Sequence, residues 1–408
     1  MTEVGERLIA RTTKLPAPVD PLLVAGADGV LFVRDGHGFA GTGPVERVPA
    51  ADVVQRLAEL RHGPGSVGGA VGPVAFATVP FLPGRATEFL VPSVAVQAGP
   101  DGSHLTTIGT DDGGERHQRE AERLVAATRR PPEPGPGSFT VRSSRTPEAW
   151  TDAVGTATER IRSGALEKVV LAREVVVEAD GPIPVDAVLL RLARGYPHCF
   201  LFLVDGFCGA SPELLVSRHA DVVRAQPMAG TVPRRGDPQD DARVVADLLA
   251  SPTYRHEHQV TIDAVHDTLL AFSSYVDYEP EPSVVALANV SHLATSVEGR
   301  LSHPAASVLE LVTALHPTPA ICGRPRQAAL DLIAELEDLD RDRYAGAVGW
   351  VDADGNGEWA VSIRCATIEG STAQIVAGNG IVGDSDPATE LIETRAKLQA
   401  LLGAIVRP

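Results

Sequence analysis

The chain has 408 residues and carries 36 Lys and Arg against 53 Asp and Glu, a formal net charge of −17. This length is enough for one large domain or two ordinary ones, and the composition is that of a globular protein. The acidic balance, without a basic run interleaved with aromatic residues, argues against nucleic acid as a partner, and an anionic substrate would need a locally positive pocket.

We expect a cytoplasmic protein. No apolar stretch approaches membrane-spanning length, and the first residues, MTEVGERLIARTTK, lack the apolar core of a signal peptide. The four cysteines form no C-x-x-C pair and fall in apolar surroundings, as buried thiols in a reducing compartment do.

The N-terminal part of the chain predicts short strands with irregular connections. Apolar runs such as LLVAGADGVLFV and GPVAFATVPFL are separated by Gly and Pro. The segment PPEPGPG, residues 131–137, is the clearest break in the chain. We therefore divide the chain into a variable N-terminal part of the fold, 1–140, and a main region, 141–408.

After this break the signals for helices and strands are sharper. Thr146 followed by Pro predicts a helix start, and the apolar face behind it runs to Gly164. The run LEKVVLAREVVVEA predicts a strand, and HCFLFLVDGF and ELLVSR predict antiparallel strands joined by GASPE. Residues 237–250 and 252–273 are helical by periodicity, DADGNG predicts a hairpin turn, and Asp386-Pro387 predicts the start of a terminal helix. The mixture indicates an α+β fold rich in antiparallel strands.

Lysine is rare in this chain: of 36 basic side chains only Lys14, Lys168 and Lys397 are lysines. Arginine cannot lose its proton in a protein, whereas a buried lysine can act as a base. Lys168 and Lys397 are therefore candidate functional residues, although chance retention of two lysines explains them equally well.

The glycines near the C-terminus spell G-x-G-x-x-G, the spacing of a dinucleotide-binding turn, at Gly378, Gly380 and Gly383. Such a turn opens a βαβ unit, and the 25 residues after Gly383 hold one helix and no second strand. The nucleotide interpretation therefore fails. We expect instead a glycine-rich loop whose backbone amides approach another ligand.

Three acidic clusters are candidate sites. On the terminal helix Glu390, Glu393 and Lys397 share a sector of ~60°, which suits either a solvated face with an i,i+4 pair or carboxylates for Mg²⁺. In RHEHQVTIDAVH the zincin pattern fails, which leaves Glu257 as an oxygen ligand or an exposed helical residue.

The third cluster contains Glu213, and a separate segment contains a possible base. Glu213 opens an apolar run and, if it is not a turn residue, has a raised pKa and can act as a general acid. Lys168 in EKVVLAR is a general base or an imine-forming lysine if it faces the interior, and otherwise a strand lysine that reaches solvent.

These segments together resemble the chorismate-utilising enzymes, the family of isochorismate, salicylate, anthranilate and aminodeoxychorismate synthases. The resemblance covers Thr146 to Leu402, and the N-terminal third matches loosely. It rests on motifs that occur in the family's order: EKVVLAR, GASPELL, QPMAGTVPR, RHEH, VSHLATSVEG, LHPTPAICGRPR, YAGAVGW, VSIRCA and AGNGIV…DPATELIETRAKL. It implies a single large domain, like that of anthranilate synthase component I, with antiparallel sheets packed as a sandwich and helices outside.

The resemblance also implies a Mg²⁺-dependent displacement on chorismate. Lys168 matches the base that activates water for attack at C2, and Glu213 matches the acid that protonates the departing 4-hydroxyl. Glu257, Glu390 and Glu393 match the metal-binding positions. The substrate-binding positions are matched by Gly230, Thr231, His292, Ala320, Tyr344, Arg364, Gly378, Gly380 and Lys397.

Within the family, three positions favour an isochorismate synthase. Lys168 favours water over ammonia, Ala229 stands where a lysine nucleophile would be, and Ala320 replaces the Thr typical of salicylate and anthranilate synthases. The alternatives are a salicylate synthase, which would also expel pyruvate, a catalytically inactive protein that binds chorismate-like dianions, and a synthase subunit that needs a glutaminase. We expect a monomer without a glutaminase partner.

Two residues depart from the family pattern. Tyr254 stands where many members have an acidic residue, three positions before Glu257, so the metal shell is expected to be thinner or water-filled. Asn379 replaces the usual Ala in the glycine segment, where it either adds a polar contact or tolerates a left-handed backbone.

Overall fold

The computed structural model describes residues 8–63, 72–110, 114–128, 135–234 and 236–406. Most of the predicted break at 131–137 lies outside these residues, as does the start of the MTEVGERLIARTTK segment. No helix within the described ranges is long and apolar enough to cross a membrane.

Within the described residues, twenty strands form one network of pairings that divides at β6 (Glu88–Gly99) into two branches. The first branch continues through β3 (His37–Pro49), β2 (Val30–Arg34), β10 (Phe200–Val204), β11 (Phe207–Ser211), β22 (Cys365–Glu369), β23 (Thr372–Ile381) and β9 (Lys168–Ala179). The second continues through β5 (Val74–Val79), β20 (Ala347–Asp352), β21 (Gly357–Val361), β12 (Leu214–His219), β13 (Val222–Gln226), β18 (Val297–Leu301) and β15 (Ser273–Tyr278).

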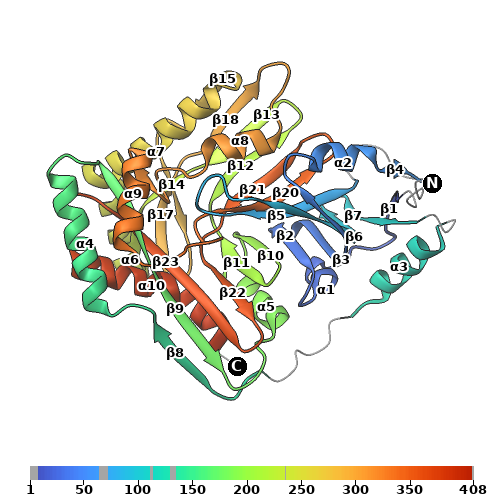
Figure 1. The fold of residues 1–408 in the computed structure, drawn as a ribbon, viewed down its shortest axis with the longest axis horizontal. Helices are drawn as coiled ribbons and strands as arrows, with labels where there is room; N and C mark the ends of the chain where they lie inside the picture. Colours follow the sequence, from blue (N-terminus) through green and yellow to red (C-terminus); the bar gives the residue numbers. More distant parts are fainter. Residues whose placement is uncertain (1–7, 64–71, 111–113, 129–134, 235, 407–408) are drawn as a thin grey trace, which may run out of the picture.

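Shorter strands complete the edges. They are β7 (Gly102–Gly109), β1 (Ile9–Lys14) and β4 (Arg61–His62) at one end, and β8 (Phe139–Ser143) and β19 (Gly323–Arg324) beside β9. A separate antiparallel sheet contains β14 (Met228–Pro233), β17 (Val290–Ala294) and β16 (Ser283–Ala286). Figure 1 places the blue N-terminal strands at one end of the molecule's long axis and the green α4 at the other.

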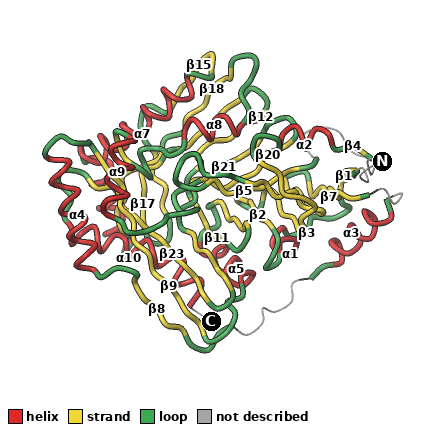
Figure 2. The backbone as a smooth tube through the Cα atoms, viewed as in Figure 1, coloured by secondary structure: helices red, strands yellow, loops and turns green. Residues whose placement is uncertain are grey.

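The helices lie around the strands, which run through the centre of the tube drawing (Figure 2). Their bounds are α1 (Pro21–Ala25), α2 (Val53–Glu59), α3 (Glu115–Ala126), α4 (Pro147–Arg162), α5 (Val185–Gly195), α6 (Pro238–Ala250), α7 (Pro252–Leu270), α8 (Val308–Leu315), α9 (Arg326–Leu336) and α10 (Pro387–Val406). The predicted helices are confirmed, including the caps, except that α7 ends at Leu270 and the predicted end at Ser273 is wrong, because Ser273 begins β15. Thr146 accepts a hydrogen bond from Ala149 N at 3.2 Å, and Asp386 accepts one from Thr389 N at 2.8 Å.

The core has two layers because the strands of the first branch are buried on both faces. Successive side chains of a strand point to opposite faces. Phe32 and Phe202 join the cluster that also holds Trp359 of the second branch, whereas Leu203 joins the cluster that holds Leu401 of α10. The predicted sandwich of antiparallel sheets with helices outside is therefore confirmed.

One predicted connection is wrong. The segment HCFLFLVDGF is not a single strand, because the chain turns at Asp205 and Gly206, where φ is 48° and 70°. Gly209 to Ser211, taken as part of a loop, lie in β11. Gly209 is needed there, since a Cβ would lie 2.7 Å from Phe202 Cζ. Only Pro212 and Glu213 connect β11 with β12, and these strands belong to different branches of the sheet network.

A buried ion pair supports β9 where it has no neighbouring strand on one side. Arg341 and Glu337 contact each other at full burial, each side chain being 2% exposed. Glu337 accepts a hydrogen bond from Ala172 N at 2.7 Å, and Arg341 donates to Ile321 O at 3.0 Å and to Val170 O at 2.5 Å. The pair thus satisfies backbone groups that a further strand would otherwise bond.

Glu337→Gln should lower the free energy of unfolding by about 3–5 kcal/mol, because it leaves the Arg341 charge buried without its counterion. Glu335→Gln is the matched control. Glu335 is on the same helix and pairs with Arg160, but both side chains are 53% exposed, so the expected loss is under about 1 kcal/mol. Denaturant titrations of both variants would measure these losses. Equal losses of unfolding free energy in the two variants would contradict a stabilising role for the buried Glu337–Arg341 pair.

Candidate active site

One cavity of about 380 Å³ brings the predicted site residues together. All fourteen of them line it: Lys168, Glu213, Gly230, Thr231, Glu257, His292, Ala320, Tyr344, Arg364, Gly378, Gly380, Glu390, Glu393 and Lys397. They come from β9 and β23 of the first branch, from the small three-stranded sheet, from α7 and α10, and from connections between elements. The individual roles of these residues stay predictions.

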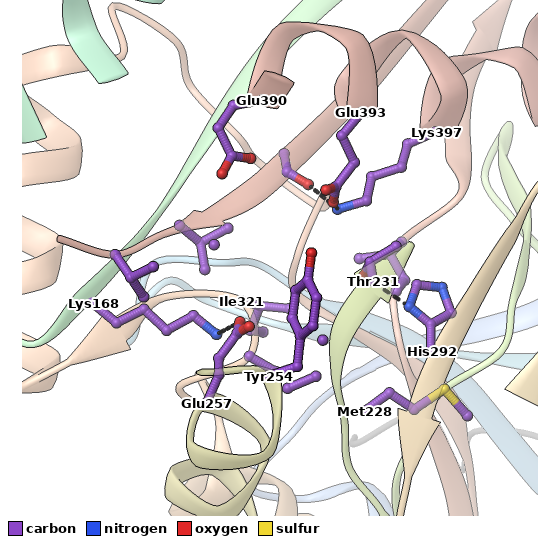
Figure 3. Close-up of a pocket in the computed structure, with 18 of the residues that line it drawn as sticks. Lys168, Met228, Thr231, Tyr254, Glu257, His292, Ile321, Glu390, Glu393 and Lys397 are labelled. Atoms are coloured by element: carbon purple, nitrogen blue, oxygen red, sulfur yellow. Dashed lines mark hydrogen bonds and ion pairs between the residues drawn. The ribbon is translucent and has the colours of Figure 1, made fainter. Parts of the chain in front are cut away.

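Lys168 is buried at the first position of β9, with 4% of its surface exposed. Its ammonium lies 2.6 Å from Glu257 Oε1 on α7, as the dashed line in Figure 3 marks. The alternative of a strand lysine that reaches solvent is therefore wrong. Lys168 instead presents a cation, held by a carboxylate, at the cavity wall.

Gly380 makes room for this ion pair. A Cβ at this position would lie 2.6 Å from Lys168 Cε and 3.0 Å from Glu257 Oε1. The predicted glycine-rich loop is wrong, however, because Gly378 and Gly380 lie within β23, opposite Ala172 and Val170 of β9. Strand pairing continues to Ile381, one residue past Gly380. The glycines therefore contribute by having no side chain rather than by offering loop amides.

Glu213 is buried in the two-residue connection between the sheet branches, with 4% of its surface exposed. Burial raises the pKa of Glu213 to about 8, against the opposing effects of the Met228 backbone N–H and the charges of Lys168 and Arg364. The Met228 N–H donates to Glu213 Oε1 at 3.4 Å. A carboxyl group in this environment is protonated at neutral pH and can donate a proton.

His292 and Arg364 form a second polar group in the cavity. Arg364 can only donate, so its contact with His292 Nε2 at 3.2 Å leaves the other ring nitrogen, Nδ1, to donate to Thr231 Oγ1 at 2.9 Å. Burial, followed by the charges of Arg364 and Lys397, holds the pKa of His292 well below its usual range, so the ring is neutral. Arg364 Nε is buried and, among the described residues, has no hydrogen-bond partner. A buried free donor of this kind fits an anionic acceptor.

The acidic side of the cavity holds Glu257 from α7 and Glu390 and Glu393 from α10, with the ring of Tyr254 between the two helices (Figure 3). Burial and then the neighbouring Glu393 raise the pKa of Glu390 to about 7. Burial, followed by the nearby carboxylates, also raises the pKa of Tyr254. Negative charge is therefore concentrated around the Tyr254 hydroxyl.

Carboxylate oxygens and an excess of negative charge fit a hard divalent cation. The described residues do not form a preassembled cage, since no group of three or more His, Cys, Asp or Glu side chains among them is arranged to hold a metal ion. Glu257 is paired with Lys168, and Glu393 is paired with Lys397 at 2.6 Å. The donor chemistry fits a cation, and in this structure the two lysines pair with two of the three carboxylates.

Some residues of the cavity were missed by the sequence analysis. Met228, Ile321 and Asp384 also line the cavity. They are adjacent in sequence to Ala229, Ala320 and Gly383, which the sequence analysis named. Tyr254 was noted only as a departure from the family. A motif marks residues that are close in sequence to a functional position, but it does not tell which of them face the cavity.

Comparison with known proteins identifies the family. The family model described as chorismate binding enzyme matches residues 72–406. The isochorismate synthase DhbC of Bacillus subtilis is 34% identical over 397 residues, which cover 92% of this chain and 94% of that protein.

Two solved structures are also similar. The putative 2,3-dihydroxybenzoate-specific isochorismate synthase DhbC of Bacillus anthracis has a TM-score of 0.79 at 31% identity, covering 95% of this chain and 99% of that one. The menaquinone-specific isochorismate synthase MenF of Escherichia coli has a TM-score of 0.80 at 26% identity, covering 97% and 94%. The cavity, the fold and these similarities agree, and the chain belongs to the family of chorismate-binding enzymes.

Proposed function

We propose that this protein is an isochorismate synthase, which converts chorismate reversibly to isochorismate. The observation that carries the proposal is the pairing of a buried lysine with a buried, protonated carboxyl group, Lys168 and Glu213, in one cavity that also holds Arg364 and Lys397. Similarity to isochorismate synthases over nearly the whole chain supports it.

In the proposed reaction a water molecule attacks C2 of the ring while the 4-hydroxyl departs. Lys168, which must be in its neutral amine form for this step, accepts a proton from the attacking water. Glu213 gives its proton to the departing hydroxyl, which leaves as water. One hydroxyl is gained and one is lost, so the product is an isomer of the substrate. The raised pKa of Glu213 supports this role, because the acid must be protonated near neutral pH.

Chorismate carries two carboxylates, and the cavity offers cations for them. Arg364, with its free Nε donor, and Tyr344 would bind the enolpyruvyl carboxylate. Lys397 lies on α10 beside Glu393 and would bind the other carboxylate. These charges reverse the sign of the local potential within a chain whose net charge is −17.

Mg²⁺ is the proposed cofactor. Glu257, Glu390 and Glu393 would hold it, since oxygen donors and excess negative charge suit this ion. When bound, it would neutralise the ring carboxylate of the substrate.

We further propose that the enzyme acts in the cytoplasm, as a monomer without a glutaminase partner. Residues 1–140 would form the variable part of the same fold and residues 141–408 the main region. The pairing of β2 with β10 and of β5 with β20 supports a shared fold, because strands of the N-terminal part lie within both branches.

Incubation with chorismate and Mg²⁺, with and without ammonia, followed by chromatography of the products, tests the proposal. We expect isochorismate alone. Salicylate with pyruvate would indicate a salicylate synthase, an aminated product would indicate ammonia as nucleophile, and no turnover would indicate a binding protein.

Lys168→Ala should reduce kcat by a factor of about 10²–10⁴, as expected for loss of a general base, while the protein stays folded. Lys14→Ala is the matched control, because Lys14 is an exposed lysine of β1 outside the cavity. Retention of most of the rate in Lys168→Ala would refute the assignment of the base.

Glu213→Gln should abolish the acid step and also change how stability depends on pH. The folded-state pKa of Glu213 is about 8, against about 4.5 for the unfolded chain, so its ionisation in the unfolded state favours unfolding as pH rises between these values. The variant should therefore gain stability relative to the wild type across this range, reaching roughly 3–5 kcal/mol near pH 8. Denaturant titrations at pH 5 and pH 8 measure the gain. A gain that does not depend on pH would contradict the buried, protonated state.

Gly380→Ala should lower kcat at least tenfold without unfolding the protein, because the methyl group would displace the flexible end of Lys168 rather than backbone. Gly155→Ala in α4 is the control, since a Cβ there meets no atom within 4 Å and alanine favours the helix. Circular dichroism would show whether both variants are folded, and steady-state assays would measure their kcat. Unchanged kcat in Gly380→Ala would show that Lys168 does not need its present position.

A further inference from the structure

Asn379 lies in β23 between the two cavity glycines, yet its side chain is not among those that line the cavity. It is 1% exposed, and its hydrogen bonds go to α10. The backbone at this position pairs with Leu171 of β9 within regular strand structure. Of the two roles left open by the sequence, the polar contact is therefore correct and the left-handed backbone is wrong.

The amide of Asn379 uses both of its ends. Its Oδ1 accepts from Lys397 Nζ at 2.9 Å, and its Nδ2 donates to the main-chain oxygen and to Oε2 of Glu390, both at 2.8 Å. The orientation of the amide is fixed by these partners, because the reversed amide would place its NH₂ group against an ammonium. Asn379 thus connects residues seven positions apart on one face of α10 with strand β23.

Lys397 has three N–H donors, and three acceptors surround it. These are Gly378 O at 3.0 Å, Asn379 Oδ1 at 2.9 Å and Glu393 Oε1 at 2.6 Å. Two of the acceptors belong to the strand. The third is the side chain of Glu393, which lines the cavity, so an incoming anion can take its place at the ammonium, or a cation can bind Glu393 in place of Lys397. Without the strand acceptors, the long stem of a lysine would have several rotamers available.

We propose that Asn379 is a positioning residue, which holds Lys397 and Glu390 against β23 so that the lysine ammonium meets a substrate carboxylate in a fixed place. This inference rests on the function proposed above. Asn379 itself does not touch the substrate and acts through the two side chains on α10.

Neither alanine nor aspartate could make both the contact with Lys397 and the contact with Glu390 that the amide of Asn379 makes. Alanine would remove one acceptor from the ammonium and the side-chain donor from Glu390. Aspartate would keep the acceptor for Lys397 but would place an oxygen against the two oxygens of Glu390.

The first test is Asn379→Ala, assayed for chorismate turnover in the presence of Mg²⁺. We expect KM for chorismate to rise about tenfold, equivalent to about 1.4 kcal/mol, with kcat changed less than about threefold. Gln374→Ala, an exposed amide on the same strand, is the control and should leave both constants unchanged. A lower melting temperature or less active protein with an unchanged KM would overturn the positioning role.

The second test is a double-mutant cycle with Lys397→Met. If Asn379 acts through Lys397, then Asn379→Ala should change KM less than about twofold in the Lys397→Met background. A tenfold rise in both backgrounds would overturn the proposed route.

The Glu390 contact has its own measurement that does not depend on catalysis. Asn379→Asp should lower the melting temperature, and adding Glu390→Gln should restore part of the loss, because the new amide can donate to the aspartate. Absence of any restoration would overturn this contact. This pair of variants also decides the case if Asn379→Ala does not fold.

Failure of the proposed function is distinguishable from failure of this inference. If the wild-type protein makes no isochorismate, the function is wrong, and the positioning role is then judged by the rise in melting temperature that chorismate produces. A rise that is smaller in Asn379→Ala than in the wild type supports the inference, and equal rises overturn it.

Discussion

The antiparallel pairing of β9 with β23 is the interaction on which the site depends. The register runs without interruption from Thr372 opposite Glu178 to Ile381 opposite Val169. It brings Gly380 beside Lys168, and the lack of a side chain there lets the lysine reach Glu257. The other side of β9 is bonded by the buried Glu337–Arg341 pair, so the strand that carries the lysine is held from both sides.

Charge within the cavity is balanced by local pairs. Lys168 neutralises Glu257 and Lys397 neutralises Glu393, whereas Arg364 faces a neutral histidine. Among the described residues no ion pair with a carboxylate offsets the positive charge of Arg364. A dianion needs a second cation, and a metal that bound Glu393 would leave Lys397 available for it. An acidic chain can in this way present a positive surface to a small substrate.

Several parts of the site could be predicted from the sequence because their signals are local. Lys168 and Lys397 are distinctive in a chain that otherwise uses arginine, and Glu213 interrupts an apolar run. The motif order gave the family and the antiparallel sandwich. The strand state of Gly378 and Gly380 could not be predicted, since glycines mark turns and close strand contacts alike.

Contacts between distant segments also could not be predicted from the sequence. Nothing in the spacing of Arg341 and Glu337 indicates that they bond to β9, more than 160 residues earlier. The lysine–glutamate pairings and the bridge through Asn379 likewise depend on which faces of β23, α7 and α10 meet. Sequence patterns identify which side chains are unusual, whereas partners are decided by tertiary packing.

The proposed base lies in the first branch of the sheet network, and the proposed acid lies in the connection between the two branches. Lys168 begins β9 of the first branch, and Glu213 lies where the chain crosses from β11 to β12 of the second. Their separation is therefore fixed by the closure of the two layers and not by any local motif. Burial within that closed core is also what raises the pKa of Glu213, at a cost in stability that increases with pH. The packing that stabilises the sandwich thus creates the environment that the acid requires, and a change that loosens the layers would alter the chemistry before it unfolded the chain.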